Sequence, residues 1–276
     1  MVKSYFLSAV IALLLFACNQ QRKNDNVTSP VSKQVSSQSL ARNVTVTARP
    51  TPISFDIAST AVIVVDMQND FGSKDGMFDR SGIDISEIRK TIAPMAKVLN
   101  AARKSGIEVI YLKMGFKPDL SDLGREEYHK RLRPLRKINA GDPFTAPTGS
   151  QGRILVRDTW NTDIISELQP LPNETVIYKT RFSGFYQTAL DSILKTREKK
   201  YLIFVGSTTS ICIESTVRDA SFRDYVPIVL EDCTAEPIGR NLSRSNHEAS
   251  LLNIQVSFGW ISSSSEFTKS IKELSP

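Results

Sequence analysis

Short runs of aliphatic and β-branched residues alternate with amphipathic segments from about residue 60 to the end of the chain. Apolar runs bounded by polar residues are typical of strands buried on both faces, and they predict strands over 60–67, 107–114, 174–179, 200–207, 226–232 and 255–260. Apolar residues at helical spacing predict helices over 86–105, 188–198, 211–224, 243–252 and 266–274. Strands that alternate with helices form right-handed crossovers. We therefore expect an α/β fold with a parallel sheet covered on both faces.

The first residues follow a different pattern from the rest of the chain. Lys3 is followed by an apolar run that ends in Leu-Phe-Ala-Cys at residues 15–18. This run is too short for an ordinary transmembrane helix and has the length of a secretory signal. Its end resembles the lipobox of bacterial lipoproteins, which implies a signal peptide over 1–17 and lipidation of Cys18. The alternative is a buried helix with an incidental cysteine.

Residues 18–47 are rich in Gln, Asn, Ser and Thr and have no hydrophobic periodicity, so we expect a flexible tether. Together with a lipidated Cys18, the tether predicts a protein anchored in the membrane of a bacterial cell envelope and facing the periplasm or the exterior. The folded part is expected to be one domain over 48–276.

Composition supports this division into a leader and one globular domain. The 276 residues are 41% hydrophobic and 23% charged, with a net charge of +6. These values exclude collagen-like, disulfide-stapled and wholly disordered chains. The segment 116–160 lacks a clear strand and carries many basic residues, so it is either a lid-like insertion or disordered, and we favour the lid.

Three residues with chemical potential follow predicted strands. Asp66 and Lys179 end strands, and Cys212 begins the helix after the strand at 200–207. Each has an ordinary interpretation: a turn cap, a surface lysine and a small core residue. Ligands of parallel sheets bind beyond the carboxyl ends of the strands, and the three side chains are expected to converge there.

A cysteine in the first turn of a helix is a candidate nucleophile. The helix dipole and a nearby Lys179 lower a thiol pKa, and a carboxylate such as Asp66 accepts the proton. The free amides around Thr208 and Cys212 are candidates for an oxyanion hole. Histidine is the usual base for cysteine, but the chain has only His129 and His247, and neither follows a strand.

Three segments carry a family resemblance. They read IVVDMQNDF, KTRFSGF and GSTTSICIESTVRDA, at residues 63–71, 179–185 and 206–220. They resemble the signature segments of the isochorismatase-like cysteine hydrolases. The resemblance implies a three-layer α/β/α sandwich with a six-stranded, mostly parallel sheet and a catalytic triad of Asp66, Lys179 and Cys212. It also implies a cis peptide at Ser207–Thr208 and an oxyanion hole made by the Thr208 and Cys212 amides.

Further segments, among them TARPTPISFD at 47–56, are similar to the ureidoacrylate amidohydrolases of this superfamily. That subfamily has an Asn where this chain has Met114 and a Tyr where it has Phe182. The resemblance places Met114, Phe116, Arg181 and Phe182 at the substrate. From charge alone, Arg181 and the cations of the insertion are expected to hold a substrate carboxylate.

Other cofactors and partners have little support in the sequence. The loop after the strand at 107–114 has no histidine, where the nicotinamidase branch binds zinc, so we expect no metal and no cofactor. The basic residues lack interleaved aromatics, so nucleic-acid binding is unsupported. Cys233 is interpreted as a buried structural cysteine. A homo-oligomer is expected.

The sequence thus predicts a cysteine amidohydrolase that cleaves a C–N bond of a small anionic amide or ureido substrate through a covalent thioester or thiocarbamate. Two alternatives stay open. One is a nicotinamidase-like or carbamoyl-amino-acid amidase. The other is an inactive, membrane-tethered binding protein on the same scaffold.

Overall fold

The computed structural model describes residues 42–125, 138–238, 243 and 245–273. The predicted signal peptide, Cys18 and most of the predicted tether lie outside these residues. Within them, no helix is long and apolar enough to cross a membrane.

A six-stranded parallel sheet forms the centre of the domain, in the order β10-β9-β8-β3-β4-β7. Its strands are β3 (Thr60–Val65), β4 (Glu108–Met114), β7 (Thr175–Lys179), β8 (Tyr201–Ser207), β9 (Val226–Ala235) and β10 (Trp260–Ser262). All six residues of β3 are buried, as its unbroken apolar sequence requires of a central strand. The predicted fold class is confirmed.

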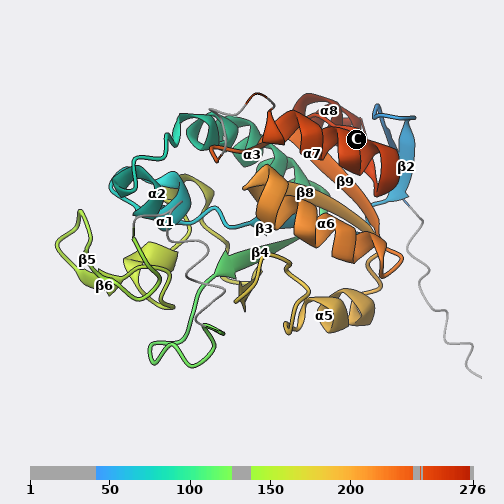
Figure 1. Cartoon of the computed structure of the whole chain (residues 1–276). Helices are drawn as coiled ribbons and strands as arrows, with labels where there is room; N and C mark the ends of the chain where they lie inside the picture. Colours follow the sequence, from blue (N-terminus) through green and yellow to red (C-terminus); the bar gives the residue numbers. More distant parts are fainter. Residues whose placement is uncertain (1–41, 126–137, 239–242, 244, 274–276) are drawn as a thin grey trace, which may run out of the picture. The chain divides into compact units, whose positions relative to one another are not determined.

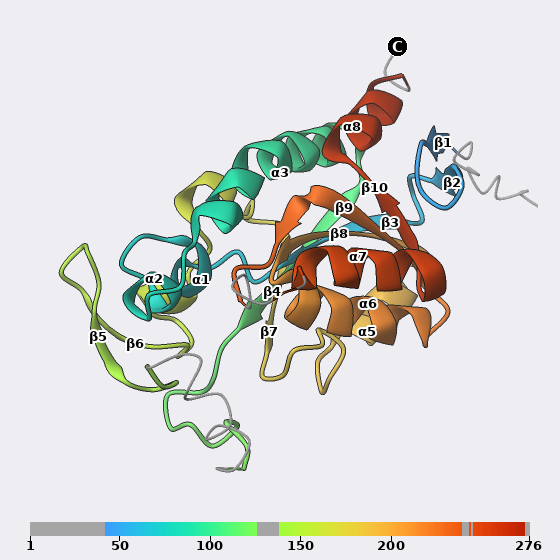
Figure 2. The same ribbon diagram turned by 45° about the horizontal axis from the view of Figure 1, so that its top comes forward.

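Helices cover both faces of this sheet (Figures 1 and 2). The side chains of Val62 and Val64 pack in the same core cluster as α3 (Ser86–Ser105) and α8 (Ser264–Lys272). Ile63 and Val65, which alternate with them, pack in a second cluster on the opposite face. That face is covered by α5 (Leu190–Thr196), α6 (Glu214–Ser221) and α7 (Asn246–Ser257). The alternation of side chains along β3 therefore builds the two cores of a three-layer sandwich.

Helix α3 has the bounds that the sequence predicts, and it ends at Gly106, whose φ of 83° lies in the left-handed region that favours glycine. The predicted strand at 255–260 is wrong. Residues up to Ser257 belong to α7, and β10 begins at Trp260. The error has a physical cause, because Leu252 and Val256 are apolar but exposed, which obscures the amphipathic pattern of the helix.

Ordered structure begins before the predicted domain boundary at residue 48. Strand β1 (Asn43–Val46) pairs antiparallel with β2 (Ile53–Asp56), and every second residue of the pair is buried. The last residues assigned to the tether therefore belong to the folded domain.

The predicted insertion at 116–160 is partly described, over 116–125 and 138–160. It contains a small antiparallel pair, β5 (Pro143–Thr145) and β6 (Gln151–Arg153), whose strands are too short to give a sequence pattern. The ring of Phe144 stacks on Trp160 with centroids 5.5 Å apart. Short helices α1 (Asn69–Gly72) and α2 (Met77–Arg80) precede α3.

Candidate active site

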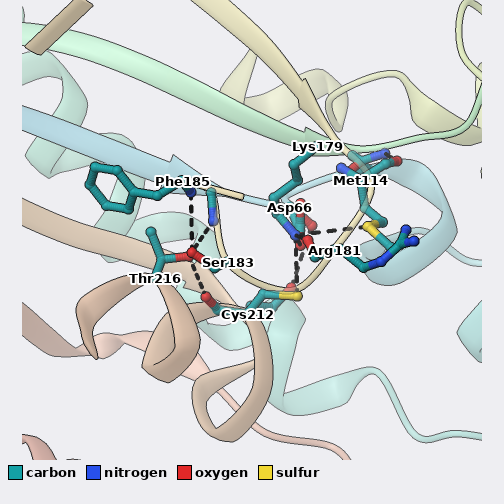
Figure 3. Close-up of polar contacts among 11 residues, drawn as sticks. Asp66, Met114, Lys179, Arg181, Ser183, Phe185, Cys212 and Thr216 are labelled. Atoms are coloured by element: carbon teal, nitrogen blue, oxygen red, sulfur yellow. Dashed lines mark hydrogen bonds and ion pairs between the residues drawn. The ribbon is translucent and has the colours of Figure 1, made fainter. Parts of the chain in front are cut away.

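The three candidate residues meet at the carboxyl ends of the sheet strands (Figure 3). Asp66 directly follows β3, Lys179 is the last residue of β7, and Cys212 lies in the turn after β8. Asp66 has a φ of 52°, in the left-handed region, and its N–H donates to the carbonyl of Leu112 on the neighbouring strand. This bond fixes a backbone conformation that is uncommon for a residue with a side chain.

Lys179 is the centre of the group. Its Nζ lies 2.7 Å from Oδ2 of Asp66 and donates to Sγ of Cys212 at 3.4 Å. It also donates to the carbonyl of Arg181 at 3.2 Å, and the sulfur of Met114 lies 3.9 Å away. Asp66 and Lys179 are each only 1% exposed. A buried charge needs a partner of opposite sign, and here each supplies the other.

These charges and their burial set the protonation of the site. Burial by itself lowers the pKa of Lys179, but the charge of Asp66, followed by Cys212, outweighs it and the net pKa is raised. Burial raises the pKa of the Cys212 thiol to about 12; Lys179 opposes this shift and Asp66 adds to it. Both raised pKa values favour a charged ammonium on Lys179 beside a neutral thiol on Cys212.

This result corrects the expectation that a helix start lowers the pKa of the thiol. Cys212 does not lie in a regular first α-turn. It lies in a π-helical turn, Thr209–Ile213, that precedes α6. Burial outweighs the charge of Lys179, so the pKa of the Cys212 thiol is raised instead of lowered.

The turn that carries Cys212 is held by contacts on several sides. It begins with a cis peptide at Ser207–Thr208, as the family resemblance implies. The Thr216 hydroxyl donates to the carbonyl of Cys212 at 2.6 Å and accepts from the amide of Gly184 at 3.0 Å. A Cβ at Gly184 would lie 2.3 Å from Leu112, so only glycine allows this loop to approach the sheet so closely.

A narrow pocket opens above the thiol. Its polar floor is made by Asp66, Ser207, Thr208 and Cys212, and its walls are apolar: Phe71, Phe78, Met114, Phe182, Ile211 and Ile238. Two of the predicted substrate contacts, Met114 and Phe182, therefore line the pocket. The described walls contain no cation, although Lys179 lies just behind the floor, paired with Asp66.

The other two predicted substrate contacts, Phe116 and Arg181, do not line this pocket. Phe116 is 1% exposed and its side chain belongs to the core on the α3 face. The guanidinium of Arg181 lies over the ring of Tyr186 and beside Gly124. It is the backbone of Arg181, through its carbonyl, that takes part in the site by binding Lys179.

Three polar residues after Asp66 have roles that the sequence did not reveal. The amide of Gln68 forms two hydrogen bonds with the backbone of Met114, and the side chain of Asn69 donates to the carbonyl of Trp160. The fully buried carboxylate of Asp70 accepts from the amide of Leu155 and from the side chain of Asn161. Gln68 therefore joins the ends of β3 and β4, and Asn69 and Asp70 fix α1 to residues 155–161. A polar run directly after a buried strand was the available signal.

Glu236, which directly follows β9, is another polar residue whose role the sequence did not reveal. It is 6% exposed, and burial raises its pKa. It accepts hydrogen bonds from Ser210 in the turn before Cys212. An isolated glutamate after a strand gives no signal of burial in a sequence.

The remaining candidates for cysteine or metal chemistry lie apart from the thiol. His247 contacts the hydroxyl of Thr209 through Nδ1 at 2.9 Å, and His129 is outside the described residues. Cys233 is a free, fully buried cysteine in the core on the α3 face. In the part of the chain that the structure describes, no group of three or more His, Cys, Asp or Glu side chains is arranged to hold a metal ion.

Comparison with known proteins shows the family of this domain. The isochorismatase domain matches residues 60–266. The chain belongs to the isochorismatase family. A ureidoacrylate amidohydrolase of Rhizobium rhizogenes is 36% identical over 242 residues, covering 87% of this chain and 94% of the relative. A second one, of Caulobacter segnis, is 38% identical over 229 residues, covering 83% and 92%.

Two solved structures are also similar to this chain. A cysteine hydrolase of Pseudomonas syringae pv. phaseolicola matches with a TM-score of 0.66 at 27% identity, over 80% of this chain and 96% of that chain. The N-carbamoylsarcosine amidase of Thermoplasma acidophilum matches with a TM-score of 0.54 at 26% identity, over 75% and 98%. The family membership thus spans almost the whole described domain.

Proposed function

We propose that this protein is a cysteine amidohydrolase that cleaves a C–N bond of a small ureido or amide substrate. The observation that carries the proposal is the contact of one buried ammonium, Lys179 Nζ, with both the carboxylate of Asp66 and the thiol of Cys212 at the floor of a pocket. The similarity to ureidoacrylate amidohydrolases supports the bond type.

In the first half of the reaction, Sγ of Cys212 attacks the carbonyl carbon while the carboxylate of Asp66 takes the thiol proton. The Thr208 and Cys212 backbone amides, which belong to pocket-lining residues, bind the oxyanion of the tetrahedral intermediate. The C–N bond then breaks as the protonated Asp66 returns the proton to the leaving nitrogen. The enzyme retains a thioester, or a thiocarbamate from a ureido substrate.

In the second half, Asp66 takes a proton from a water molecule, and the resulting hydroxide attacks the same carbon. Cys212 leaves as a thiolate beside Lys179 and recovers its proton from Asp66. Lys179 stays charged throughout the reaction. Its ammonium stabilises the negative charge both when that charge is on Asp66 and when it is on the Cys212 thiolate.

The apolar walls of the pocket favour a substrate whose reacting part is small and carries no charge at the floor. Ureidoacrylate is the first substrate to test because of the relatives that act on it. The prediction of an anionic substrate depends on cations outside the described walls, such as those of the insertion. Carbamoyl amino acids and nicotinamide represent the alternative amidases.

The test is ammonia release by the purified protein from ureidoacrylate, a carbamoyl amino acid and nicotinamide. Turnover of any of them by the wild-type protein, lost in the Cys212→Ala variant, is the expected result. No turnover of any amide or ureido compound would contradict the proposal and favour the inactive binding protein.

We also propose that Cys18 is lipidated and anchors the domain to a bacterial membrane, on the strength of the lipobox-like residues 15–18. Palmitate labelling of the full chain in a bacterial host tests this. Label that disappears in Cys18→Ala, and persists in Cys233→Ala as the control, is the expected result. Equal labelling of both variants would contradict it.

A further inference from the structure

Glu236 lies next to the turn that carries the nucleophile. Strands β8 and β9 pair in parallel, with Ser207 opposite Ala235 as their last pair. The residues that follow this last pair are Thr208 after β8 and Glu236 after β9. Thr208 is the second residue of the cis peptide. The register of the sheet therefore brings a glutamate to the backbone of the proposed oxyanion hole.

The carboxylate of Glu236 receives hydrogen bonds on both of its oxygens. Oε2 accepts from the backbone N–H of Ser210 at 2.9 Å and from its hydroxyl at 2.5 Å. Oε1 accepts from the backbone N–H of Ile238 at 3.0 Å. Both backbone groups are obligate donors, so both oxygens must be acceptors. An ionised carboxylate is the side chain that meets this requirement, and hydrogen bonds to a charged acceptor are strong.

These contacts fix two parts of the pocket at once. Ser210 lies between Thr208 and Cys212, the two residues whose amides are proposed to bind the oxyanion. Ile238 is itself a wall residue of the pocket. The side chain of Glu236 does not line the pocket, but it lines a neighbouring cavity of about 500 Å³. Its influence on substrate is therefore indirect.

From this geometry we infer that Glu236 is a positioning residue for the oxyanion hole. Resting on the function proposed above, the inference is that Glu236 holds the turn at Thr208–Ser210 so that the amides of Thr208 and Cys212 meet the oxyanion. Cys212 does not depend on this contact for its reactivity as a nucleophile, because the thiol contacts Lys179, which is paired with Asp66.

The test compares Glu236→Gln with wild type and with Glu231→Gln. Glutamine keeps the shape of the side chain but directs an NH₂ donor at one of the two backbone N–H donors. Glu231 lines the same cavity and pairs with Arg49 on the surface, which makes it a matched control. In each full-length protein, kcat and KM are measured on the best amide substrate. The rate of Cys212 alkylation by iodoacetamide is followed by mass spectrometry of the cysteine peptide.

Alkylation separates positioning from a general structural effect, because it needs the thiol but forms no oxyanion. For Glu236→Gln we expect kcat to fall about 10- to 100-fold, less than the roughly 10²- to 10³-fold loss on removing an oxyanion donor, because the backbone amides are displaced and not removed. KM and the alkylation rate should stay within about twofold of wild type. An interaction made only in the transition state does not contribute to substrate binding, so its loss leaves KM unchanged. Glu231→Gln should match wild type in all three.

An unchanged kcat, or an alkylation rate that falls in parallel with kcat, would overturn the inference. If Glu236→Gln does not fold, Ser210→Ala removes the hydroxyl that donates to Glu236 and should lower kcat about fivefold, again without slowing alkylation. A wild-type protein that turns over no amide would instead contradict the proposed function, and the inference would fall with it.

Discussion

Cys212 and Cys233 are the same residue type in two regions with different neighbours. Both thiols are free and buried, and burial raises the pKa of both. Cys233 is a residue of β9 and lies in the core of the domain. Asp232 raises the pKa of its thiol further, and the Ser264 side chain opposes this rise. Cys212 instead accepts a hydrogen bond from the Lys179 ammonium and faces a pocket.

From this difference we expect burial alone to leave a thiol inert, and we expect this of Cys233. At Cys212 the same burial is combined with two neighbouring groups. The carboxylate of Asp66 is the proposed base for the thiol proton, and the ammonium of Lys179 is the cation that can stabilise the resulting thiolate. On the mechanism proposed above, such a thiol is neutral at rest and becomes a nucleophile when Asp66 takes its proton during the attack on the substrate carbonyl.

The largest expected effect comes from replacing each of the two cysteines by alanine in separate variants. Cys212→Ala should lower turnover by more than about 10⁴-fold, because the covalent intermediate cannot form. Cys233→Ala should keep turnover within about threefold of wild type, since its side chain is outside the pocket. Ammonia release measures both. Comparable losses in the two variants would remove the distinction.

The second effect concerns the base. Asp66→Asn should lower turnover by about 10²- to 10⁴-fold, the usual contribution of a general base. The same change should accelerate iodoacetamide alkylation of Cys212 at pH 7, because Asp66 raises the pKa of the thiol and Lys179 would be left to lower it. Asp119→Asn, on the exposed insertion, is the control. Slower alkylation in Asp66→Asn would show that the carboxylate does not act in this way.

The third effect is the pH dependence of alkylation in the wild-type protein. With a pKa of about 12, the thiolate fraction of Cys212 is small at neutral pH and grows about tenfold per pH unit below that value. The alkylation rate should therefore rise without a plateau from pH 6 to pH 9, while Cys233 stays unmodified in the folded protein. A plateau reached at or below pH 7 would indicate a resting thiolate instead.

The smallest effect is on stability. Removing the sulfur of the fully buried Cys233 leaves a small cavity, which should cost about 1 kcal/mol and lower Tm by about 2–4 °C. Cys212 lines a pocket and is 7% exposed, so it is less completely enclosed by packed side chains and Cys212→Ala should lower Tm less. Thermal unfolding followed by circular dichroism measures both. A larger loss in Cys212→Ala would mean that the thiol is chiefly structural.

Much of the fold was predictable because its signals are local. The apolar run at Thr60–Val65 and the helix Ser86–Ser105 were recognisable from periodicity alone. The strand expected at 255–260 was not, since the exposure of Leu252 and Val256 depends on what packs against α7. Strand β1 was missed because its four residues are too few to establish an alternating pattern.

For the site, the sequence placed Asp66, Lys179 and Cys212 at strand ends, and parallel topology implied that they meet. It did not separate Met114 and Phe182, which line the pocket, from Phe116 and Arg181, which do not. Which side of a loop faces a pocket depends on packing between segments far apart in the chain.

The sequence by itself determined the fold class, the family and the chemical types at the strand ends, because hydrophobic periodicity and motif spacing are properties of neighbouring residues. Only the tertiary structure decided that the Cys212 thiol is neutral at rest and that the buried carboxylate of Glu236 supports the turn beside it. Burial and charge pairing arise when residues such as Lys179 and Asp66, remote in sequence, are brought within 2.7 Å of each other. No local pattern contains that distance.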